Sequence, residues 1–81
     1  MKHEEVFEKL KEIMGSLRPD ADLNQITEET LLVEELGMDS LFMLMMALQS
    51  EKVFGIRFDS MQTSTLRTAG DVCGYIESKL K

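Results

Sequence analysis

Apolar residues recur at helical spacing through residues 6–17, and a proline then ends the pattern. Steps of three and four positions place these residues on one face of an amphipathic helix. They are Val6, Phe7, Leu10, Ile13, Met14 and Leu17. Pro19 ends the helix because a proline disfavours helical geometry at the residue before it. The chain must bury this apolar face against other elements, which makes helix packing the first constraint on its fold.

A second helix is predicted from Ser40 to about Phe54. Asp39 precedes it as an N-cap candidate, and Gly55 follows it as a C′ residue. Gly37 supplies backbone freedom for the turn that leads into the helix. This segment therefore has both a start signal and a stop signal.

A last helix is predicted to begin at a capping box formed by Thr68 and Asp71, with Asp in place of the usual Glu. Its apolar stripe is Val72, Cys73, Ile76 and Leu80.

Residues 54–58 are interpreted as an apolar-anchored loop, because a single strand would have no partner. A short helical turn is expected at 60–65. These elements predict an all-α fold, a small four-helix bundle of three main helices plus one short helix, with residues 1–81 as one domain.

A long loop, residues 20–38, connects the first two main helices. Loops of this length in small domains usually have a function or contain a helical turn. Its apolar residues are expected to pack against the helices. They are Leu23, Ile26, Leu31, Leu32, Val33 and Leu36.

Charge is distributed unevenly along the chain. Its 15 Asp and Glu against 9 Lys and Arg give a net charge of −6, which argues against nucleic-acid binding. Residues 19–51 contain eight acids and no Lys, Arg or His. This acidic middle is either a solvated face or a docking surface for a basic partner.

No apolar run reaches bilayer length and no signal peptide is apparent, so a cytoplasmic protein with no membrane span is expected.

Neither catalytic nor metal-binding residues are predicted. The chain has one His and one Cys, and Cys73 lies in an apolar stripe, where an inert core thiol is expected. A possible calcium loop over residues 20–31 has Gln25 where Gly is needed and Leu31 where a bidentate Glu is needed. A serine nucleophile needs a base within hydrogen-bond reach, and the one histidine, His3, is expected on the frayed first turn of the first helix. The sequence has no Gly-rich phosphate-binding loop.

The segment Leu36-Gly37-Met38-Asp39-Ser40-Leu41 resembles the Leu-Gly-x-Asp-Ser-Leu signature of acyl carrier proteins. Taken alone, a Ser after Asp is usually an ordinary helix cap. The flanking segments 54–56 and 68–76 also resemble that family, in the right order and spacing, so the similarity extends over almost the whole chain.

The resemblance implies a non-catalytic carrier that holds acyl groups as thioesters on a covalent 4′-phosphopantetheine arm. By position, Ser40 is the attachment residue, and Asp39 and Leu41 flank it. The implied partners are a phosphopantetheinyl transferase and acyl-loading and acyl-transfer enzymes of fatty-acid, polyketide or modified-lipid synthesis. Their basic docking surfaces would meet acids that include Glu34 and Glu35. The chain is expected to be a monomer, and its acidic charge argues against nucleic acid as a partner.

The predicted second helix departs from the family pattern. Phe42 and Met45 stand where the family often has Asp and Glu. With Phe54 facing the core, helical spacing places five further residues near that side: Met43, Met46, Ala47, Ser50 and Val53. Five others are then expected to be partly exposed: Leu41, Phe42, Leu44, Met45 and Leu48. The apolar excess either serves the core or forms a docking patch that includes Phe42 and Met45.

Two further questions stay open at this point. The docking patch would suit a specialised carrier, or alternatively an unmodified helical adaptor that binds a protein partner through the Met-rich helix. Ser50 stands where the family usually has a large apolar residue. It either widens the interior or caps a nearby backbone group.

Overall fold

The computed structural model describes residues 2–58 and 65–80, and these form three α-helices and one 3-10 turn. The elements are α1 (His3–Leu17), η1 (Leu23–Gln25), α2 (Ser40–Phe54) and α3 (Ala69–Leu80). The all-α prediction is confirmed. The short fourth helical element that is described is η1, within the long loop, whereas the turn predicted at 60–65 falls mainly on residues 59–64, outside the described part.

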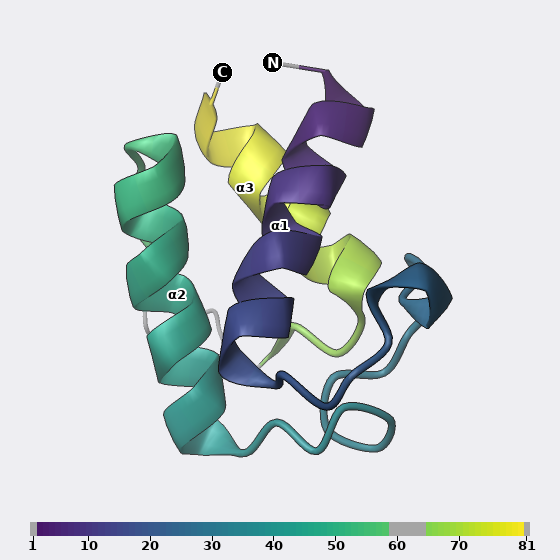
Figure 1. Cartoon of the computed structure of the whole chain (residues 1–81). Coiled ribbons are helices and arrows are strands. Elements are labelled where there is room, and N and C mark those ends of the chain that lie inside the picture. Colours follow the sequence, from purple (N-terminus) through teal and green to yellow (C-terminus); the bar gives the residue numbers. More distant parts are fainter. Residues whose placement is uncertain (1, 59–64, 81) are drawn as a thin grey trace.

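The helices are arranged with α1 packed against both α2 and α3 (Figure 1). α1 begins and α3 ends at the same end of the molecule, while α2 begins at the opposite end, beside the long loop. Within the described residues, no helix combines the length and apolar character needed to cross a bilayer.

α1 contributes the predicted apolar face to the core. Val6, Leu10, Ile13, Met14 and Leu17 are buried, and Phe7 is partly buried against them. The α1 stripe is thus covered by the loop and the other two helices, as the sequence predicts.

α2 begins and ends at the predicted residues. The Asp39 carboxylate accepts a hydrogen bond from the Phe42 N–H at 3.1 Å, and Gly55 adopts a left-handed φ of 66° after the last turn. The predicted core face is confirmed at most positions: Met43, Met46, Ala47, Ser50 and Phe54 are buried.

Three apolar residues predicted to be packed are exposed instead. Leu80 is 36% exposed, because it is the last residue of α3. Val53 is 48% exposed because it lies about 100° around the helix from the buried Phe54. Val33 is 58% exposed because the turn that holds Leu32 and Leu36 in the core leaves it facing outward. The other loop anchors are buried or partly buried, as predicted.

The loop is fastened to the start of α3 by three backbone hydrogen bonds. The Leu32 N–H donates to the Arg67 carbonyl at 2.9 Å, and the Ala69 N–H donates to the Thr30 carbonyl at 3.0 Å. The Gly70 N–H donates to the Glu28 carbonyl at 2.9 Å. We call residues 28–32 the strap, because they hold the long loop against the bundle.

α3 starts with the predicted capping box. The Thr68 N–H donates to the Asp71 carboxylate at 3.1 Å, and the Asp71 N–H donates to the Thr68 hydroxyl at 3.0 Å. Backbone N–H groups of Arg67 and Thr68 therefore lower the pKa of Asp71. The segment before α3 is anchored as predicted, since Ile56 and Phe58 pack against the core.

Gly70 permits the close approach of the strap to α3. A Cβ atom at Gly70 would lie 2.8 Å from the Glu28 carbonyl oxygen, whereas a Cβ at Gly74 would meet nothing within 4 Å. We expect Gly70→Ala to lower the free energy of unfolding by about 1–3 kcal/mol, through the displaced strap. The matched change Gly74→Ala should raise it by about 0.5–1 kcal/mol, through helix propensity. Urea unfolding measures both values, and equal effects would contradict the close contact.

Ser50 is fully buried, and its hydroxyl has no hydrogen-bond partner among the described residues. A buried hydroxyl without a partner costs about 1–3 kcal/mol. We therefore expect Ser50→Ala to raise the thermal midpoint by about 4–8 °C. Ser78→Ala, which changes an exposed helical serine, controls for helix propensity. A lower midpoint for Ser50→Ala would mean that the hydroxyl caps a backbone group after all.

Candidate functional site

The strap holds the first turn of α2 in its position within the bundle. Leu32 carries the strap's hydrogen bond to Arg67, and its carbonyl also accepts the Met38 N–H at 3.0 Å. Between these residues the chain turns through Gly37, whose φ is 64°. Met38 is fully buried, so the chain is anchored two residues before Ser40. Ser40 therefore occupies a fixed position at the end of the bundle.

Ser40 is the first residue of α2, and it is exposed. The first N–H groups of a helix have no intrahelical partners, and the helix dipole is positive at this end. An anionic group attached to the Ser40 hydroxyl would thus lie beside a favourable potential. Asp39 is committed to the Phe42 N–H, so its carboxylate acts as a helix cap.

His3, the one histidine of the sequence, is not positioned to act as a general base for Ser40. His3 begins α1, and a helix of 15 residues is about 22 Å long. α1 and α2 begin at opposite ends of the bundle, so the imidazole lies far from the Ser40 hydroxyl. His3 therefore cannot activate the Ser40 hydroxyl as a nucleophile.

Leu41 and Phe42, which follow Ser40, differ in their surroundings. Leu41 is 60% exposed, as predicted. Phe42 is partly buried against the core, and the Arg18 guanidinium lies 5.3 Å from its ring centroid. Phe42 is thus partly exposed, as predicted. No local signal predicts Arg18 beside this site, because the contact depends on how the loop folds back.

Four apolar side chains on α2 form what we call the α2 patch. Helical spacing places them on one face. Their exposed fractions are 60% for Leu41, 50% for Leu44, 37% for Met45 and 50% for Leu48. These residues do not serve the core, so the apolar excess of α2 is a surface feature that begins immediately after Ser40.

The two acids predicted to meet partners behave differently. The Glu35 carboxylate accepts a hydrogen bond from the Leu31 N–H at 2.7 Å, which stabilises the turn before α2. Glu34 is exposed. Of the pair, Glu34 is the one whose carboxylate has no local bond among those described.

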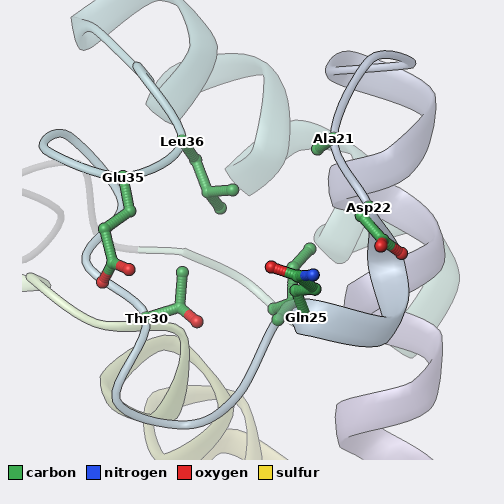
Figure 2. Close-up of a pocket in the computed structure, with 7 residues that line it drawn as sticks. Ala21, Asp22, Gln25, Thr30, Glu35 and Leu36 are labelled. Atoms are coloured by element: carbon green, nitrogen blue, oxygen red, sulfur yellow. The ribbon is translucent and has the colours of Figure 1, made fainter.

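A cavity of about 190 Å³ lies between η1 and the turn before α2. Figure 2 shows Thr30, Glu35 and Leu36 on one side of it, opposite Gln25 and Asp22. Two carboxylates at the wall make it a poor site for an apolar chain. Ser40 is not among its lining residues, so the cavity is separate from the start of α2.

Comparison with known proteins connects this geometry to a family. The family model described as "Phosphopantetheine attachment site" matches residues 5–76. The chain is 39% identical to the acyl carrier protein of Thermotoga maritima over 77 residues, which is 95% of this chain and 94% of that protein. It is 38% identical to the acyl carrier protein of Coprothermobacter proteolyticus over 80 residues, 99% of this chain and 96% of that protein.

A solved structure gives the same result. The acyl carrier protein from Enterococcus faecalis superposes with a TM-score of 0.81 at 26% identity, covering 98% of this chain and 99% of that one. The family match, the relatives and the fold agree over nearly the full chain. The chain therefore belongs to the acyl carrier protein family, whose members carry acyl groups on a covalent 4′-phosphopantetheine arm and are not themselves enzymes.

Proposed function

We propose that Ser40 is the residue that carries the 4′-phosphopantetheine arm, with Asp39 and Leu41 as its flanking residues. The observation that supports this most directly is the exposed Ser40 side chain at the first position of α2. It lies within the segment that the attachment-site family matches. The Asp39 cap and the buried Met38 hold the backbone on one side of Ser40, so a modifying enzyme meets a preorganised hydroxyl.

The electrostatics at this end of the bundle are balanced. The phosphodiester of the arm adds negative charge near Asp39, while the N-terminus of α2 offsets part of that repulsion. Arg18 adds a cation at the same end of the molecule, since a Cβ at Gly37 would lie 3.4 Å from its Nη2 atom. In this proposal the arm attaches where Arg18 and the N-terminus of α2 offset part of the surrounding negative charge.

The α2 patch and Glu34 form the proposed docking surface for partner enzymes. The patch begins at Leu41, so a partner that binds there is placed beside the arm. The partners in this proposal are a phosphopantetheinyl transferase, of which the chain is a substrate, and acyl-loading and acyl-transfer enzymes in the cytoplasm. The alternative of an unmodified adaptor has no support in the comparisons, which match carriers.

Modification of Ser40 is tested by incubating the chain with coenzyme A and a broad-specificity phosphopantetheinyl transferase. We expect the intact mass to rise by one phosphopantetheine group, because the hydroxyl is exposed. Ser40→Ala should show no increase, and Ser78→Ala, a second exposed serine, should be modified like the parent chain. No increase under conditions that modify a known carrier, or an increase that survives Ser40→Ala, would rule the assignment out.

Docking through the α2 patch is tested with Met45→Glu in the same reaction. A carboxylate in an apolar contact should reduce the kcat/KM of arm transfer about tenfold, corresponding to about 1.4 kcal/mol. Val53→Glu is the matched control, since Val53 is an exposed apolar residue of the same helix outside the patch. Met45 suits this test better than Phe42, whose contact with the core would make Phe42→Asp affect the fold. Equal rates for both variants would exclude the patch as a docking site for this enzyme.

A further inference from the structure

His3 lies at the centre of a cluster of polar side chains from three parts of the chain. Its Nδ1 atom is 2.6 Å from Glu77 Oε1 on α3, and its Nε2 atom is 3.0 Å from Glu28 Oε2 on the strap. The side chains of His3 and Glu77 are 42% and 32% exposed. The imidazole is therefore ordered between two carboxylates and reachable from solvent.

Cys73 completes the cluster from inside. Its Sγ atom is 3.3 Å from Glu77 Oε1 and 3.8 Å from His3 Nδ1. Cys73 and Glu77 are four residues apart on α3, so both project from the same helix face. Nitrogen, sulfur and oxygen donors, one from each residue, lie within 4.8 Å of one another.

We propose that His3, Cys73 and Glu77 form a zinc-binding site, with His3 Nδ1, Cys73 Sγ and a Glu77 carboxylate oxygen as ligands. Zinc takes nitrogen, sulfur and carboxylate ligands in tetrahedral sites. Calcium and magnesium are harder ions that prefer oxygen ligands, so this mixed set suits zinc better. Three protein ligands leave a fourth position for water on the exposed side of His3 and Glu77.

The separations between the donor atoms fit a tetrahedral ion. Zinc–ligand distances of about 2.0–2.3 Å place the donors of such a site about 3.3–3.6 Å apart. The sulfur–oxygen and sulfur–nitrogen separations of 3.3 and 3.8 Å lie close to that range. The nitrogen–oxygen separation of 2.6 Å is that of a hydrogen bond, and it would open when an ion replaces the shared proton.

Glu28 supplies the outer support that metal-binding histidines usually have. A neutral His3 that donates its Nε2–H to Glu28 leaves the Nδ1 lone pair free for the ion. Glu28 is itself held in place, because its carbonyl accepts the Gly70 N–H at 2.9 Å. The strap therefore fixes the orientation of the imidazole.

The three ligands come from two helices, since His3 begins α1 and Cys73 and Glu77 lie on α3. The ion would join the start of α1 to α3, at the end of the bundle opposite Ser40.

Cobalt(II) is the probe for this site, because a cobalt–thiolate bond absorbs in the near ultraviolet. Untagged full-length protein should develop this absorption up to one cobalt per chain, and zinc should abolish it. The absorption should be absent in Cys73→Ala, and the affinity should fall at least tenfold in His3→Gln. No absorption in the parent chain, or absorption that persists in Cys73→Ala, would overturn the proposal.

Two control variants separate this site from other metal ligands. Ser40→Ala removes the thiol that a phosphopantetheine arm would bring, and it should keep the absorption. Glu34→Gln removes an exposed acid outside the cluster and should keep it as well. Loss of the absorption in Ser40→Ala would assign the metal to the arm instead of to Cys73.

Thermal unfolding gives a second measurement that does not depend on Cys73→Ala folding. At a hundredfold excess of free zinc over Kd, the midpoint of the parent chain should rise by about 10 °C or more. His3→Gln changes an exposed side chain and should lose most of that rise. An equal rise in both proteins would show that zinc binds elsewhere.

Discussion

Three backbone hydrogen bonds between the strap and the start of α3 hold the long loop against the helices of this small domain. They join Glu28, Thr30 and Leu32 to residues 67–70, far away in the sequence. Through Leu32 the same segment holds Met38 and thereby the start of α2. Through Glu28 it holds the imidazole of His3 at the other end of α1. Buried backbone N–H and C=O groups must be hydrogen-bonded. In this loop the strap bonds to residues 67–70, and the following turn forms hydrogen bonds within residues 31–38.

α2 combines two tasks on its two faces. One face completes the core with five buried residues, and the other exposes the α2 patch. A carrier needs an anchor point that is fixed in position yet open to many enzymes, and the first turn of a capped helix provides both. Ser40 is exposed while the residues on either side of its turn, Met38 and Met43, are buried. The α2 patch lies beside this proposed attachment residue, and it suits partners recognised by apolar shape and adaptable thioether contact as well as by charge.

The two ends of the bundle are chemically distinct. The end with Ser40 contains the long loop, the exposed acid Glu34 and the contact between Arg18 and Phe42. The other site contains His3, which pairs with carboxylates of the strap and of α3. The exposed first turn of α1 is thus held by polar contacts to elements distant in sequence. Helix ends usually fray, but here contacts with Glu28 and Glu77 connect the first turn of α1 to distant parts of the fold.

Local signals in the sequence determined the three helices, their caps and the position of the carrier signature. Asp39, Gly55, Thr68 and Asp71 act on neighbouring backbone groups, so their effects can be predicted without knowing the fold. The exposure of Val33 and Val53, the Arg18–Phe42 contact and the gathering of His3, Glu28, Cys73 and Glu77 were decided only by the tertiary structure. Periodicity defines which face of a helix a residue occupies, but the neighbours that cover that face come from distant parts of the chain. Their positions follow from packing and from the strap's hydrogen bonds, which no short segment specifies.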